Sequence, residues 1–343
     1  MTMSFRRTAF VGLLVCALCT APVMGEEDGA RRSAMAGRKL SEEAVRNLES
    51  GLEAAPDNVE ARTELLGYYL LRAYSSKEAK EARQRHILWL INNRPDAPIL
   101  GSSFTQLDAT LDGSAFTEGK QAWLNQVARE PENAAFLGKA AAYLLFEDRA
   151  LAESLYKRAE AAEPQNPIWP DRLGHLYSLG LSRKTGEERQ ESAKAVLAAY
   201  ERSLQHLKDG GNLLQEAAKA AFEAGDLAKA RGYAEAVLAN TGEDGYKLHQ
   251  GHLVLGRIAL RADDVAKAKE HLLAAGKTPG SPGLNSFGPN MALAKELLEK
   301  EERQVVLEYF KLCGNFWKED RLDTWAQEVR AGKIPDFGAN LEY

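Results

Sequence analysis

Two histidines, His249 and His252, come closest in type and spacing to a chemical site. On a helix they lie one turn apart, so their imidazoles could bind one transition metal. Such a site needs a third ligand, either His271 or a carboxylate of a neighbouring helix. His252 also takes a bulky packing position, which makes helix packing the competing interpretation. We predict no metal site, and keep a metal-binding or enzymatic protein that uses the His249 and His252 face as the alternative function.

The sequence carries no recognisable signature of a catalytic centre. It lacks a Gly-x-Ser-x-Gly nucleophile turn, a phosphate loop and the glycine fingerprint of dinucleotide-binding proteins. Among 49 acidic residues some carboxylates will lie close together by chance, so no pair of them indicates a glycosidase. We therefore predict that the chain is not an enzyme, has no catalytic residues and needs no cofactor.

The charge pattern makes nucleic acid a poor candidate for a partner, and we predict none. The formal net charge is -5, and charges of both signs are spread along the chain without a basic arm. Binding of nucleic acid relies on a clustered basic surface that neutralises phosphates. No apolar stretch beyond the first residues approaches the length of a bilayer span, so we predict no membrane span in the mature chain.

The N-terminus has the features of an export signal. Arg6 and Arg7 precede an apolar run over 9–21 that is too short to span a bilayer comfortably. We predict a signal peptide over residues 1–25, cut after Gly25, and hence a periplasmic or secreted protein.

Cysteine usage agrees with a fold that is held together by packing alone. Cys16 and Cys19 lie in the predicted leader, so only Cys313 remains in the mature chain. A single cysteine can form no internal disulfide. We interpret Cys313 as a small apolar side chain on a helix.

The rest of the sequence predicts an all-α protein. Ala, Leu, Glu, Lys and Arg dominate, and apolar residues recur at spacings of three and four. Pro-x-Asn and Gly-Asp breaks come at short, fairly regular intervals, which favours a series of helical hairpins.

One hairpin, closed by Pro164, is the clearest unit. Its first helix carries a bulky, a small and an aromatic residue, and its second a small, an aromatic and a small one: Phe136, Ala140, Tyr143, Ala152, Tyr156 and Ala159. This pattern resembles the tetratricopeptide repeat, although Lys139 stands where leucine is usual. Two helices approach closely only where alanine or glycine faces the partner.

The same register recurs, and we count about five units in all. The further units pair these residues: Leu173, Gly174 and Tyr177 with Val196, Tyr200 and Ser203; Leu214, Ala218 and Ala221 with Ala230, Ala234 and Leu238; His252, Leu255, Gly256 and Ala259 with Ala268, Leu272 and Ala275; and, more weakly, Leu66, Gly67 and Leu70 with Ala82, His86 and Trp89.

The resemblance implies a tetratricopeptide-like helical-hairpin solenoid, an α-α superhelix, over residues 41–277. Residues 26–40 are expected to be a flexible tether, and Ser41 to cap the first helix. The segment 95–119 is irregular and is either an ordered loop or a degenerate repeat.

A different module is expected after the last repeat. The run Thr278-Pro279-Gly280-Ser281-Pro282-Gly283 cannot be helical and marks a boundary. Three further helices, over 290–300, 302–312 and 318–330, would form a C-terminal helical capping module over residues 278–343, which covers the apolar face of the last repeat. A separate binding role is the alternative for this module.

In the repeat that the sequence resembles, the first helix of each pair lines a concave groove. The implied partner-binding groove residues are Leu137, Leu144, His175, Gln215, Lys219, Phe222, Leu253, Arg257 and Arg261.

This groove would run from apolar to cationic, which suits a protein or peptide with an apolar stretch and a carboxylate-bearing end. The competing interpretation is that Lys219, Arg257 and Arg261 are solvated or paired with acidic neighbours. The predicted function is an exported scaffold or adaptor for protein-protein interaction. A self-associating structural repeat protein is a further alternative.

Overall fold

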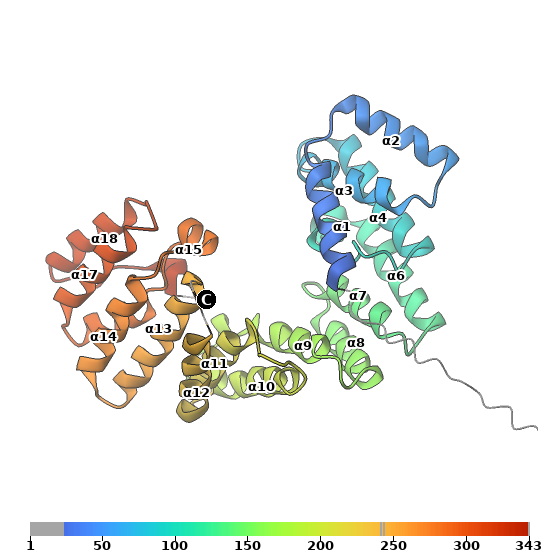
Figure 1. Cartoon of the computed structure of the whole chain (residues 1–343). Coiled ribbons are helices and arrows are strands. Elements are labelled where there is room, and N and C mark those ends of the chain that lie inside the picture. Colours follow the sequence, from blue (N-terminus) through green and yellow to red (C-terminus); the bar gives the residue numbers. More distant parts are fainter. Residues whose placement is uncertain (1–23, 241, 243, 342–343) are drawn as a thin grey trace, which may run out of the picture. The chain divides into compact units, whose positions relative to one another are not determined.

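The computed structural model describes residues 24–240, 242 and 244–341, and all the regular secondary structure in them is helical (Figure 1). This confirms the all-α prediction. The predicted leader over residues 1–25 falls almost wholly outside these residues. The described chain divides into two compact units, one ending at Gln126 and one beginning at Val127. That division lies inside the segment predicted to be one run of repeats.

The first unit contains the helices that precede this division, and the last of them crosses it. They are α1 (Met24–Gly37), α2 (Glu42–Ala54), α3 (Val59–Arg72), α4 (Lys77–Asn93), the short 3-10 helix η1 (Ser103–Thr105), α5 (Ala109–Asp112) and α6 (Ser114–Arg129).

Helix α1 corrects the prediction of a flexible tether over residues 26–40. The helix packs on α3, and its Ala34 is fully buried. The contact depends on Gly67 of α3, because a Cβ there would lie 1.8 Å from the carbonyl oxygen of Ala34. Gly67 was expected to face the partner helix of its own pair. Gly67 instead allows α1 to approach α3. The polar sequence of α1 did not indicate that this helix packs on another one.

Replacing Gly67 with alanine should loosen α1 from α3, because the new methyl group would overlap the backbone of Ala34. We expect a loss of about 2 kcal/mol, as for other overpacked contacts. Urea-dependent hydrogen exchange of peptides covering 24–72 measures it. The matched control is Gly51→Ala in α2, where a Cβ meets nothing within 4 Å and where alanine should stabilise the helix by up to about 1 kcal/mol. Equal behaviour of the two variants would contradict this account.

Two other expectations for this unit can be compared with the structure. The Oγ of Ser41 accepts a hydrogen bond from the backbone N–H of Ala44 and so caps α2 as predicted. The irregular segment 95–119 is an ordered loop in its first part, where Ile99 and Leu107 are fully buried. Its last part belongs to α5 and α6.

The second unit holds four predicted pairs of helices, followed by the C-terminal module. The pairs are α7 (Ala134–Leu144) with α8 (Arg149–Ala162), α9 (Ile168–Ser178) with α10 (Gly186–Leu204), α11 (Leu213–Glu223) with α12 (Leu227–Ala239), and α13 (Gly245–Arg261) with α14 (Val265–Gly276); the 3-10 helix η2 (Leu181–Arg183) joins the second pair.

Within this unit, each helix from α7 to α14 packs against the next one along the chain, which confirms a tetratricopeptide-like solenoid of helical hairpins. The small residues of the predicted register are buried as expected, among them Ala140, Ala159, Ala218 and Ala268. Gly174 shows why the register matters, because a Cβ there would lie 2.3 Å from the ring of Tyr200 on the paired helix.

The C-terminal module packs on the last pair, as a cap would. It comprises α15 (Pro282–Phe287), α16 (Ala292–Glu299), α17 (Arg303–Cys313), α18 (Arg321–Arg330) and the 3-10 helix η3 (Gly338–Leu341). Its side chains share one apolar core with Leu272 and Ala275 of α14. Cys313 lies in that core, where burial raises the pKa of its thiol, in keeping with an apolar packing role. Helix α15 was not predicted and starts at Pro282, since proline fits the first turn of a helix.

Candidate functional site

A cavity of about 170 Å³ lies in the second unit, where the first helices of successive pairs meet the C-terminal module. Helices α11 and α13, which contact each other, supply most of its wall. The residues that line it are Ser178, Leu181, Arg189, Val196, Tyr200, Glu216, Lys219, Ala220, Phe222, Glu223, Gln250, Leu253, Val254, Arg257, Asn290, Ala292 and Leu341.

Four of the predicted groove residues come together at this cavity: Lys219, Phe222, Leu253 and Arg257. They lie one helical turn apart on α11 and on α13, so each pair projects from one face of its helix. Arg261 belongs to the same cluster, because its guanidinium lies 5.3 Å from the centre of the Phe222 ring.

The other predicted groove residues lie elsewhere. Leu137 and Leu144 are fully buried, so they belong to the core and not to an accessible groove floor. His175 is exposed on α9, outside the cavity lining. Gln215 is buried on α11 and does not line the cavity either.

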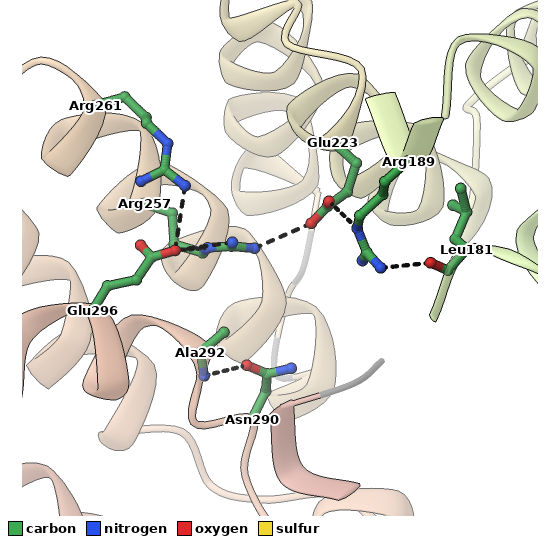
Figure 2. A network of polar contacts seen from close by, with 8 residues as sticks. All are labelled: Leu181, Arg189, Glu223, Arg257, Arg261, Asn290, Ala292 and Glu296. Atoms are coloured by element: carbon green, nitrogen blue, oxygen red, sulfur yellow. Dashed lines mark hydrogen bonds and ion pairs between the residues drawn. The ribbon is translucent and has the colours of Figure 1, made fainter. Parts of the chain in front are cut away.

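The cationic end of the predicted groove is a network of ion pairs (Figure 2). Arg257 lies between two carboxylates, 3.4 Å from Glu223 Oε1 and 2.9 Å from Glu296 Oε1. Arg189 donates to the other oxygen of Glu223 at 2.6 Å, and Arg261 approaches Glu296 at 3.4 Å. Three arginines and two glutamates thus alternate across the end of the cavity.

The charges of this network are therefore largely compensated inside the protein. Lys219 also has an acidic partner, Glu216, at 3.0 Å. Although burial alone would raise the pKa of Glu223, hydrogen bonds from Arg189 and the charge of Arg257 lower it, so the carboxylate stays ionised. The structure thus supports the interpretation in which Lys219, Arg257 and Arg261 pair with acidic neighbours.

Gln250 is one of the polar residues of the site that sequence reasoning missed, and the ion-paired Arg189, Glu223 and Glu296 are others. Gln250 is 3% exposed and lines the cavity, and its Nε2 atom has no hydrogen-bond partner among the described residues. A buried polar group in that state costs free energy, so it is a feature that needs an explanation. The signal in the sequence was its position on α13, three residues before Leu253 and on the same face.

The C-terminal module supplies one wall of the cavity through Asn290, Ala292 and Leu341. Asn340 holds this wall in place by donating from Nδ2 to the carbonyl oxygens of Phe287 and Pro289. The module thus covers the last repeat and also completes the cavity.

His249 forms hydrogen bonds to both the last repeat and this module. Its Nδ1 lies 3.1 Å from the carbonyl oxygen of Ala275, and its Nε2 accepts the backbone N–H of Asn290 at 3.1 Å. A carbonyl oxygen only accepts, so Nδ1 must donate and the ring must be neutral. Burial lowers the pKa of His249 to about 4, which agrees with that state. Both ring nitrogens are engaged, so neither is available to a metal.

His252 contacts His271 instead, with their Nδ1 atoms 3.1 Å apart. Burial first, and the neighbouring imidazole second, lower the pKa of His252 to about 4. Across the described residues, no group of three or more His, Cys, Asp or Glu side chains is arranged to hold a metal ion. The face of His249 and His252 therefore does not support the metal-binding alternative.

In the part of the chain that the structure describes, no helix has the length and apolar character needed to traverse a bilayer.

Comparisons with known proteins add little to this geometry. No protein-family model matches the chain, and no curated protein matches it. Among solved structures, the chain is similar to a human IFIT1 dimer with m7Gppp-AAAA, with 16% identity and a TM-score of 0.46 over 91% of this chain and 71% of that one. The fold described above therefore rests on this chain's own helix pairs.

Proposed function

We propose that this chain is a protein-interaction scaffold that binds a segment of another protein in the cavity formed by α11, α13 and the C-terminal module. The observation that carries the proposal is the convergence of Phe222, Leu253 and the buried, unpartnered Gln250 on one cavity. Apolar walls with a few placed polar groups are typical of binding sites.

The size of the cavity favours a single anchoring side chain. A cavity of about 170 Å³ is close to the roughly 150 Å³ that can hold benzene in a protein core. A leucine or phenylalanine side chain of a partner would fill it against Val196, Leu253 and Val254. Anchors of this kind carry much of the energy of protein-protein interfaces.

Filling the cavity from its half-buried wall tests this function. A random peptide display library panned on the immobilised full chain should yield peptides that share one large apolar residue. Ala292→Trp should reduce their capture at least about tenfold, because the indole takes the place of the anchor.

The matched control is Ala150→Trp, also in the first turn of a helix but at an exposed position outside the cavity. It should capture the peptides as the wild type does. Equal loss in both variants, or no loss in Ala292→Trp, would exclude this cavity as the binding site. The helical circular dichroism of both variants should remain unchanged.

Export remains part of the proposal and is supported by Arg6, Arg7 and the apolar run that follows them. A cut after Gly25 would leave the contact between Ala34 and Gly67 in the mature chain. Sequencing the N-terminus of chain recovered outside the cytoplasm tests the cut. Self-association of the repeats stays a prediction, which light scattering at several concentrations tests.

A further inference from the structure

We propose that Gln250 makes this site specific for an uncharged anchor, by pairing with the peptide bond of the apolar residue that enters the cavity. The inference rests on the proposed function and concerns the chemistry of the bound segment. It replaces the expectation of a carboxylate-bearing partner.

The amide of Gln250 has hydrogen-bonding capacity that the protein leaves unused. A primary amide has two donor hydrogens on Nε2 and an acceptor at Oε1. The Nε2 of Gln250 is buried and has no partner among the described residues, although the side chain lines the cavity. The carbonyl oxygen of a peptide bond is the acceptor that this Nε2 lacks, so it can accept a hydrogen bond from it. A bound peptide bond would thereby relieve the cost of leaving Nε2 unpaired.

The charges around the cavity disfavour an anionic ligand. A carboxylate ligand would have to compete with Glu223 and Glu296 for the guanidinium of Arg257. Glu296 also keeps a buried Oε2 atom that has no hydrogen-bond partner, and this oxygen would repel an incoming anion.

The single positive charge in excess belongs to Arg261, whose side chain is 47% exposed and so is screened by water. A neutral acceptor meets none of these obstacles. We therefore expect binding that depends on the apolar anchor and changes little with salt.

Two small probes distinguish a neutral from an anionic anchor: N-acetyl-L-phenylalanine methylamide and N-acetyl-L-phenylalanine as its carboxylate. Each is titrated into the ¹⁵N-labelled full chain while the side-chain NH₂ resonance of Gln250 is followed. We expect the methylamide to bind with a Kd of about 1 mM, as its size allows. The Kd should change less than about twofold between roughly 50 and 500 mM NaCl. Tighter, salt-sensitive binding of the carboxylate would overturn the inference.

Gln250→Met, which keeps the length of the side chain but removes its amide, is the decisive variant. It should weaken the methylamide about fivefold, the loss expected for one hydrogen bond. Its thermal midpoint should not fall, because an unpaired buried donor has been removed, whereas a purely structural role of Gln250 predicts a fall. Unchanged binding of the methylamide to Gln250→Met would contradict the role of Gln250.

Peptide capture by Ala292→Trp tests the proposed function separately. If Ala292→Trp loses capture while Gln250→Met binds the methylamide normally, the proposed function holds without Gln250. If Ala292→Trp keeps capture, the proposed function is wrong as well.

Discussion

Replacing His249 with alanine is expected to destabilise the second unit by about 4 kcal/mol, because two buried backbone groups lose their partners at once. The carbonyl of Ala275 would lose its donor, and the N–H of Asn290 its acceptor. The imidazole also leaves a cavity between α13 and the C-terminal module. The midpoint of urea-dependent hydrogen exchange, read from peptides covering 245–300, measures the loss.

Two variants make this result interpretable. His249→Gln keeps one donor and one acceptor, so it should lose clearly less stability than His249→Ala. His175→Ala removes an exposed imidazole from α9 and should change stability by less than about 0.5 kcal/mol. If His249→Ala is as mild as His175→Ala, then His249 does not fasten the module to the repeat.

Lowering the pH from about 6.5 to about 4 is expected to cost the second unit about 3 kcal/mol through His249 alone. The folded state holds its pKa near 4, whereas the unfolded chain has the ordinary value of 6.5. The unfolded state therefore binds the proton first as the pH falls, so stability is full above the unfolded pKa and is lost between the two values. His252 and His271, whose pKa values are also lowered, add to the loss in the same direction.

The neutral variant His249→Gln isolates this effect. Its stability, measured by the same hydrogen-exchange midpoints, should fall less steeply than that of the wild type across the same pH range. Carboxylates such as Glu223, whose pKa lies below its usual range, titrate mainly under this window. Parallel pH profiles of wild type and variant would show that His249 is not the titrating group.

The helix pairs could be predicted from the sequence because small residues recur at the positions where paired helices touch. Ala140, Gly174 and Ala268 are buried where the pattern placed them. Such positions tolerate only alanine or glycine when two helices are in contact, so their spacing reports the packing directly.

The elements that depend on long-range contacts were not predictable in this way. Helix α1 has a polar sequence, and it packs on α3 because Gly67 and Gly37 have no Cβ at the contact. Leu137 and Leu144 occupy the expected face of their helix, but the sequence could not show that this face is covered.

The candidate site was predicted in part, for a related reason. The periodicity of α11 and α13 placed Lys219, Phe222, Leu253 and Arg257 on the faces that meet at the cavity. The periodicity within one helix could not show that Glu296 of α16 forms an ion pair with Arg257 of α13, because this contact joins two different helices. The predicted cationic groove was therefore a compensated network. Among the described residues that line the cavity, the neutral Gln250 has the buried polar atom without a hydrogen-bond partner.

Methyl NMR of the full chain, titrated with a peptide selected from the display library, tests most directly whether the cavity of the second unit is the binding site. The account predicts that the methyl resonances of Leu181, Leu253 and Val254 shift together and saturate with one Kd. Shifts confined to exposed leucines of the first unit, such as Leu71 and Leu111, with those cavity methyls unchanged, would contradict it.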